Sequence, residues 1–187
     1  MTTTREQIIQ STCDLLENQG YHATGLNEIV KESGAPKGSI YYYFPQGKEE
    51  ITAEAVLFAG RTVAGRIQAH LAENDNAAEA VQSFVETIAY HVETSGFKAG
   101  GPLTIVASET ATTSERLNQA CREAYALVRE AFRAKLLDAH FSPDSAASLA
   151  WMITAAIEGA IVLSRTYHTG DPLREAAREL ARLIRNR

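Results

Sequence analysis

A very short break between two helical segments, at Gly34-Ala35-Pro36, constrains the fold of this chain more than any other feature. Gly34 can adopt the positive φ that ends a helix, and Pro36 suits the first position of the next helix, where its missing N–H costs nothing. Upstream, the apolar spacing predicts a helix over residues 3–19, and Thr24 offers a hydroxyl to cap the helix that follows. The segment is therefore predicted to form three helices, the last two joined by a tight turn, which is the helix-turn-helix unit.

The helix that starts at Pro36 exposes groups suited to DNA phosphates. Ile40 and Phe44 follow at four-residue spacing and are expected to face inward. Helix N-termini offer free N–H groups and a positive dipole end to phosphate, a glycine lets the backbone approach closely, and hydroxyl and ammonium groups add donors. Tyr42 has core packing as an equal alternative. The residues predicted to contact DNA are Thr24, Lys37, Gly38, Ser39, Tyr41, Tyr42 and Tyr43.

These motifs resemble the N-terminal domain of TetR/AcrR-type transcriptional regulators. The resemblance covers residues 4–52 and rests on Gly20-Tyr21-x-Ala23-Thr24, Ile29-Val30, residues 34–45 and Lys48-Glu49. It implies a ligand-responsive repressor that binds double-stranded operator DNA. It also implies that Lys48, at the start of the next helix, contacts the phosphate backbone; the alternative is an ordinary exposed lysine. A helix-turn-helix protein that reads two half-sites needs a two-fold partner, so a homodimer is expected.

Motifs further along the chain resemble the LmrA/YxaF-like branch of that family. They are Gly101-Pro102-Leu103, Ser114-Glu115-Arg116-Leu117, Glu158-Gly159-Ala160, Ser164-Arg165 and Pro172-Leu173, with the extra glycine of Pro45-Gln46-Gly47-Lys48. The branch more often has a cysteine where this chain has Gly101, so no thiol role is expected there. The resemblance implies control of an efflux or catabolic operon and a small apolar or aromatic, flavonoid-like effector.

Charge alone argues against a nucleic-acid binder. The net charge is −5, and residues 1–48 contain four Lys or Arg against five Asp or Glu. A helix-turn-helix can hold phosphate with hydroxyls, backbone N–H groups and a few lysines, so a broad basic patch is unnecessary, and modest non-specific affinity is expected. An arginine row in the last helix is interpreted as a solvated face, with DNA contact as the alternative: Arg174, Arg178, Arg182 and Arg185.

The remaining sequence predicts helices and no strands. Helical spacing of apolar residues is found over 48–73, 77–94, 102–107, 114–140, 142–168 and from 171 onward. The predicted fold is therefore all-α: an N-terminal three-helix helix-turn-helix domain over residues 1–48, followed by a helical ligand-binding and dimerisation domain over residues 49–187.

The stretch from Leu149 to Ser164 is the most apolar part of the chain. Glu158 interrupts it and it is shorter than the roughly 20 residues of a bilayer span, so it is predicted to be a helix of a soluble protein, buried on two sides. Its small residues would allow close helix packing. Either this helix and the last helix pack against their copies in a homodimer, or this helix packs within one chain against the helix that carries Cys121. These residues are Ala155, Ala156, Gly159 and Ala160.

An effector pocket is predicted around Glu158, because an unpaired buried carboxylate is costly. Glu158 could hydrogen-bond a ligand or pair with a buried Arg or Tyr, and Trp151 lies earlier on the same predicted face. Most of the apolar members are equally good core residues. The predicted ligand-binding residues are Phe84, Ile88, His91, Leu103, Val106, Phe132, Trp151 and Glu158.

No catalytic residues, metal site or cofactor are predicted. The five histidines show neither paired helical spacing nor a CxxC neighbour, and no nucleophile–base or carboxylate-pair pattern stands out. Cys13 and Cys121 lie in apolar helical stripes, as reduced core thiols of a cytoplasmic protein do; a redox switch at Cys121 is the alternative. Two rival functions remain: an enzyme on a helical bundle, and a helical small-molecule carrier or interaction module without specific DNA binding.

Overall fold

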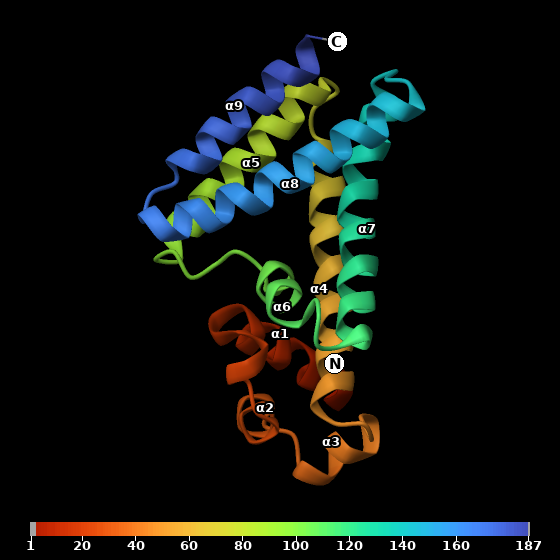
Figure 1. The fold of residues 1–187 in the computed structure, drawn as a ribbon, viewed down its shortest axis with the longest axis vertical. Coiled ribbons are helices and arrows are strands. Elements are labelled where there is room, and N and C mark those ends of the chain that lie inside the picture. Colours follow the sequence, from red (N-terminus) through yellow and green to blue (C-terminus); the bar gives the residue numbers. More distant parts are fainter. Residues whose placement is uncertain (1–2, 187) are drawn as a thin grey trace. The chain divides into compact units, whose positions relative to one another are not determined.

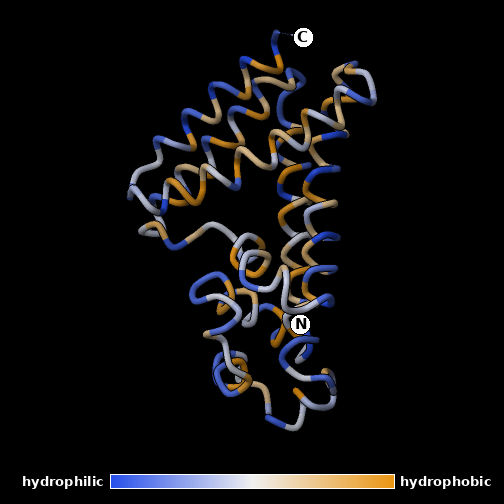
Figure 2. Tube along the Cα trace, viewed as in Figure 1, coloured by the Kyte–Doolittle hydropathy of each residue, from blue (hydrophilic) through white to orange (hydrophobic). Residues whose placement is uncertain are grey.

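The computed structural model describes residues 3–186, and within that range it contains nine α-helices and no strand (Figure 1). The helices are α1 (Thr4–Ala23), α2 (Leu26–Ser33), α3 (Lys37–Tyr43), α4 (Lys48–Leu71), α5 (Ala77–Thr94), α6 (Pro102–Thr110), α7 (Glu115–Asp138), α8 (Pro143–Tyr167) and α9 (Asp171–Arg185). The all-α prediction is confirmed. Along α4 and α7, hydrophobic positions alternate with hydrophilic ones, as in helices with one buried side (Figure 2).

Contacts divide the chain into two compact units. The first contains the described residues up to Arg61 together with 101–125, and the second contains 62–100 together with the described residues from 126 onward. The first half of α4, all of α6 and the first part of α7 therefore pack with the three N-terminal helices. The functional boundary at residue 48 stays a prediction.

The first unit is built around the inward side of α1. Gly20 has φ 80° and ends the regular part of α1, which agrees with the helix predicted over residues 3–19, and a short further turn continues to Ala23. Helix α1 packs against α2 and α6. The fully buried apolar side chains of this unit include Ile8, Leu16, Ile29, Ile40, Phe44, Ile51 and Leu117.

The second unit is centred on α5, which packs against α9 and α8. Glu93 on α5 joins these helices, because its carboxylate accepts hydrogen bonds from the Arg174 guanidinium at 2.6 and 3.0 Å and from the Gly170 N–H at 2.9 Å. This contact lowers the pKa of Glu93, the Arg174 hydrogen bonds being the larger cause. Three arginines of the α9 row pair with carboxylates, as expected of a solvated face: Arg174, Arg178 and Arg182.

Within one chain, helix α8 is buried on one side only. Ala160 is buried and Ala156 is half-buried, so these two alanines serve packing inside the chain. The opposite side leaves apolar residues exposed to solvent. This exposed α8 face consists of Trp151, Met152, Ala155, Gly159, Val162 and Leu163.

Helix α8 is long and apolar enough, by length and composition, to cross a membrane. The same property belongs to core helices of soluble proteins, and the buried side of α8 packs on α9 and α5 in that manner. Helix α8 was expected to be buried on two sides. In the single chain only one side is buried, and the exposed α8 face still needs an explanation.

Candidate nucleic-acid interface

The turn between α2 and α3 has the predicted geometry. Gly34 ends α2 in the left-handed region, with φ 64° and ψ 6°. Pro36, with φ −55° and ψ 138°, is the N-cap of α3, one position before the predicted one, which is within the usual uncertainty of helix ends. Helix α3 therefore starts directly after the turn, and its first N–H groups are not used by the preceding turn.

Buried residues of α3 set which side chains reach solvent. Ile40 and Phe44 are fully buried, as predicted. Lys37, Gly38 and the three tyrosines are exposed, while Ser39 is half-buried. Tyr42 is 79% exposed, so the core-packing alternative does not apply to it, and its ring meets the Tyr43 ring edge-on at 5.0 Å. The exposed set thus offers a lysine, a glycine and phenol groups on one short helix.

Gly38 has no structural reason inside the chain to be a glycine. A Cβ added at Gly38 would meet no atom within 4 Å, and the residue is helical and exposed. Gly38 is the second residue of α3, and glycine favours helix less than alanine does, so this position carries a cost without an internal benefit. An outside molecule that approaches the α3 backbone closely would supply the reason.

Thr24 differs from its prediction as a helix cap and phosphate donor. The side chain is fully buried, and its hydroxyl donates to the Gly20 carbonyl at 2.7 Å, closing the end of α1. Gly25 is the N-cap of α2 instead, and its N–H donates to the Glu28 carboxylate at 2.8 Å. Helix α1 kinks at Gly20, and the Thr24 hydroxyl bonds to the local backbone there, as threonine side chains commonly do at helix ends.

Lys48 is the first residue of α4 and is half-buried. Its ammonium lies 4.0 Å from the centre of the Tyr21 ring, a cation–π distance. Partial burial lowers the pKa of Lys48, and the nearby carboxylates of Glu109 and Glu28 act in the opposite direction. Lys48 is therefore held by its neighbours, unlike the freely solvated lysine of the alternative interpretation.

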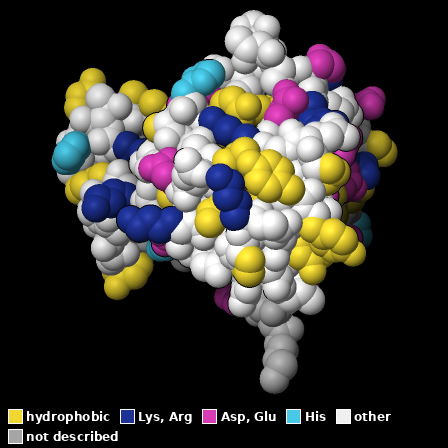
Figure 3. Space-filling view, turned by 90° about the horizontal axis from the view of Figure 1, so that it is seen from below, with side chains coloured by type: hydrophobic (Ala, Val, Ile, Leu, Met, Phe, Trp, Pro, Cys, Tyr) yellow, Lys and Arg dark blue, Asp and Glu magenta, His cyan; other side chains and the backbone are white. Residues whose placement is uncertain are grey.

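One exposed cation of the helix-turn-helix segment is missing from the predicted DNA contacts. It is Lys31, in the last turn of α2, and its charge in the helix before the turn was the available signal. On the side of the molecule drawn in Figure 3, Lys and Arg side chains form separate groups between hydrophobic ones. The expectation of modest non-specific affinity stays a prediction.

Two family models cover most of the chain. Residues 8–55 match the model of bacterial regulatory proteins of the tetR family, and residues 77–179 match the C-terminal domain of LmrA/YxaF-like transcriptional regulators. The chain belongs to the TetR family. Both predicted resemblances are thereby confirmed.

The relatives of this TetR-family regulator match it along almost its full length. The HTH-type transcriptional regulator YxaF of Bacillus subtilis is 40% identical over 98% of this chain and 96% of its own. LmrA of the same organism is 37% identical over 90% of each chain. A TetR regulator from Legionella pneumophila has the same fold, with a TM-score of 0.83 at 22% identity over 98% of each chain. The relatives are transcriptional regulators, so this TetR-family protein is not an enzyme.

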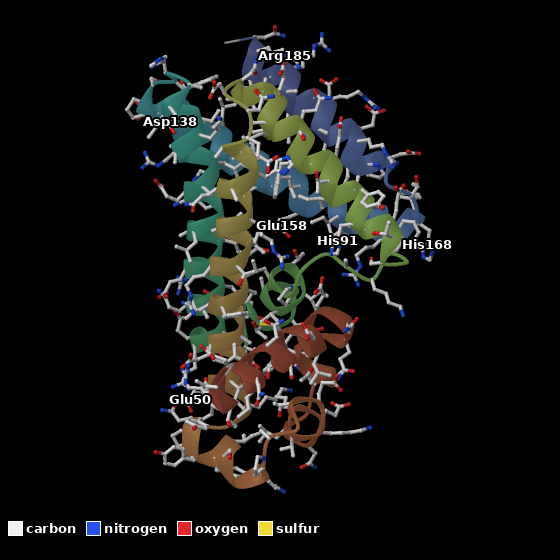
Figure 4. All side chains as sticks on the ribbon, turned by 180° about the vertical axis from the view of Figure 1, so that it is seen from behind. Glu50, His91, Asp138, Glu158, His168 and Arg185 are labelled. Atoms are coloured by element: carbon white, nitrogen blue, oxygen red, sulfur yellow. The ribbon has the colours of Figure 1, made fainter. Side chains whose placement is uncertain are left out.

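The predicted effector residues of this regulator are divided between the two units. Leu103 and Val106 are buried in the first unit. In the second unit, Phe84 meets the buried Phe132 edge-on at 5.9 Å, and Ile88 is half-buried. His91 on α5 is exposed and Glu158 on α8 is half-buried (Figure 4). The structure thus brings Phe84 and Phe132 together.

Trp151 lies outside any such pocket. It is 58% exposed and belongs to the exposed α8 face, where the Arg129 guanidinium lies 4.1 Å from the centre of its ring. Seven residues are about two helical turns, so Trp151 and Glu158 do lie on nearly the same side of α8. Glu158 is half-buried there, whereas the Trp151 ring points to solvent and lines no cavity within the chain. The prediction that Trp151 lines the pocket with Glu158 is corrected.

Two hollows on the described surface contain none of the predicted effector residues. One, of about 250 Å³, lies between α4 and α7 in the first unit and is lined by Glu50, Ala53, Glu54, Leu57, Arg116, Gln119, Ala120 and Glu123. The other, of about 290 Å³, lies beside the start of α5. Residues 3–186 hold no group of three His, Cys, Asp or Glu side chains able to bind a metal ion. Burial raises the pKa of the Cys13 thiol to about 12 and that of Cys121 to about 11, so neither is a ready thiolate.

Proposed function

We propose that this protein is a cytoplasmic, ligand-responsive repressor that binds operator DNA as a homodimer through α3. One observation carries the proposal. On one side of α3, Ile40 and Phe44 are fully buried, and the other side exposes hydrogen-bond donors around Gly38. Lys37, Tyr41, Tyr42, Tyr43 and Lys48 are proposed as phosphate contacts, and the half-buried Ser39 as a weaker one. Thr24 would act on DNA only by closing the end of α1.

The exposed α8 face is the proposed dimer interface. Exposed apolar side chains that line one helix mark sites of association, and TetR-family regulators typically dimerise. Ala155 and Gly159 at its centre are small, so two copies of α8 can approach closely there. We therefore propose Ala155 and Gly159 as interface residues. Ala160 is buried within the chain and is left out of the proposed interface.

The effector proposal rests on the second half of the chain. A small apolar or aromatic molecule would contact Phe84, Ile88, His91 and Phe132 of the second unit, and Glu158 would accept a hydrogen bond from it. Leu103 and Val106 are buried in the first unit and are not included in this proposal. A ligand that prefers one arrangement of α4 would shift the population toward a state that separates the two α3 helices and weakens operator binding. Control of efflux or catabolic genes is proposed from the resemblance to LmrA and YxaF alone.

The rival is a helical carrier or interaction module without specific DNA binding. The exposed donors of α3 disfavour it, because a carrier needs no glycine that costs helix stability at an exposed position. A gel shift on the promoter DNA of the protein's own gene, repeated over a range of salt concentrations, separates the two. A carrier would show no salt-dependent shift.

Removing two α3 donors should weaken operator binding without unfolding the protein. Lys37→Ala combined with Tyr41→Phe deletes one charge and one hydroxyl outside the Ile40/Phe44 side. Phosphate contacts act on all sequences, so non-specific binding should fall too, and the slope of log K against log salt should flatten by about one unit. Fluorescence anisotropy on operator and random DNA measures both. Native circular dichroism with unchanged affinity would contradict the assignment.

Trp151 should report dimer formation. The chain has one tryptophan, so its emission is unambiguous. Burial of the exposed α8 face between two copies removes water from the ring, and the emission should shift to the red as dilution dissociates the dimer. Emission measured against protein concentration, beside sedimentation velocity, tests this. A dimer that dissociates with constant emission would place Trp151 outside the interface.

A further inference from the structure

Two carboxylates fasten α6 to α1 within the first unit. Glu109, near the end of α6, accepts hydrogen bonds from the backbone N–H groups of Tyr21 at 2.8 Å and His22 at 3.0 Å, both through Oε2. Near the start of α6, the Gly101 N–H donates to Glu17 Oε1 at 2.8 Å. The two contacts join α1 and α6 at both ends of α6. Of the two, the contact of Glu109 lies beside the proposed DNA-contacting residues.

The end of α1 is shaped to receive the Glu109 carboxylate. Gly20 has φ 80°, which turns the chain so that the next two N–H groups point out of the helix. A Cβ at Gly20 would lie 2.4 Å from Glu109 Oε1, so only glycine leaves room for the carboxylate. Both the backbone conformation and the space at position 20 therefore favour this contact.

Tyr21 connects this contact to Lys48. Its backbone N–H is held by Glu109, and its half-buried ring lies under the Lys48 ammonium at 4.0 Å. The carboxylate of Glu109 also acts on Lys48 directly: burial lowers the pKa of that lysine, and Glu109 is the stronger of the two carboxylates that oppose this effect. One residue of α6 thus affects both the support and the charge environment of Lys48.

We propose that Glu109 is a positioning residue for DNA binding, which holds Tyr21 and thereby fixes the Lys48 ammonium for its phosphate contact. The proposal rests on the proposed function, because Lys48 is itself a proposed DNA contact. Helix α6 also carries Leu103 and Val106, so a displacement of α6 would reach Lys48 through the same carboxylate. Glu109 itself touches no DNA in this proposal.

Three variants of Glu109 and its neighbour separate positioning from a general structural role. Glu109→Ala removes the carboxylate, Glu109→Gln retains an oxygen that can accept the two N–H groups but loses the charge, and Ser108→Ala is the matched control on α6. The Ser108 hydroxyl donates only to Thr104 O, within its own helix. The chain has five lysines, so the signals of ¹³C-labelled lysine ε-methylene groups can be assigned by substitution.

The free protein gives the first result. In the wild type, the Lys48 ε-methylene protons should be shifted upfield by the Tyr21 ring. The shift should be lost in Glu109→Ala and kept in Glu109→Gln and Ser108→Ala. The pKa of Lys48 should fall below the wild-type value in both Glu109 variants. A Lys48 signal and pKa that stay unchanged in Glu109→Gln and Glu109→Ala would overturn the proposal. If Glu109→Ala fails to fold, the pKa of Lys48 in Glu109→Gln decides alone.

Operator binding gives the second result, in a double-mutant cycle with Lys48→Met. Lys48→Met should weaken binding by about tenfold, as expected for one charged hydrogen bond. Glu109→Ala should weaken operator binding by no more than Lys48→Met does. In the Lys48→Met background, Glu109→Ala should have no further effect on operator binding. Additive losses would show that Glu109 acts elsewhere. If Lys48→Met binds like the wild type, the proposed role of Lys48 fails, while the spectra still decide whether Glu109 positions it.

Discussion

Replacing Gly159 with arginine should produce a folded monomer that binds operator DNA roughly a hundredfold more weakly, because the second half-site then no longer adds to affinity. Gly159 lies in the exposed α8 face, and a Cβ there meets no atom within 4 Å. The arginine therefore disturbs nothing inside the chain, and each subunit should keep its helical fold. Two copies of the charge would meet where the two α8 helices approach each other, without a partner.

Light scattering measures the mass, circular dichroism the fold, and anisotropy the operator affinity. Gly65→Arg is the matched control, since Gly65 is also an exposed helical glycine with no atom within 4 Å of a Cβ, but it lies on α4. The control should stay dimeric. A Gly159→Arg protein that also stays dimeric would show that the exposed α8 face is not the interface.

Gly38→Ala should stabilise the protein and weaken operator binding at the same time. The added methyl group has open space around it within the chain, and alanine in place of a helix glycine contributes up to about 1 kcal/mol. On DNA, the same methyl group would keep the α3 backbone from the phosphates. Loss of one charged hydrogen bond costs about 1.5 kcal/mol or more, which is at least about tenfold in affinity.

Gly65→Ala controls for stability, because it should raise the melting temperature without changing operator affinity. Thermal unfolding and anisotropy on the same samples give both quantities. A Gly38→Ala protein that gains stability and binds as tightly as the wild type would mean that α3 does not approach the phosphate backbone at Gly38. The opposite signs of the two effects make this test independent of expression level or partial unfolding.

The local features of the chain predicted most of what is local in the structure. Gly34 ends α2 with a positive φ, and Ile40 and Phe44 are buried at four-residue spacing. These outcomes depend on backbone preferences and helical periodicity, which act between residues close in sequence. The resemblance to the TetR family likewise rests on short motifs whose spacing is visible without a structure.

Positions whose role depends on the three-dimensional path of the chain were not predictable in this way. Thr24 was expected to cap α2, but α1 kinks at Gly20 and the Thr24 hydroxyl donates to the Gly20 carbonyl instead. Trp151 was expected in a pocket, yet it lies on the exposed α8 face beside Arg129. An apolar helical pattern indicates that a residue is shielded from water. It does not indicate whether the same chain or another molecule provides the shielding.

The sequence by itself determined that the chain is helical, where α2 and α3 turn, and which side of α3 is buried, because steric limits on φ and the period of the helix need no distant contact. Only the tertiary structure decided that α6 is fastened to α1 through Glu109, that Lys48 lies over Tyr21, and that one side of α8 is left exposed. Those contacts join residues up to 88 positions apart, and packing in three dimensions is what selects them among many pairs of equal chemistry.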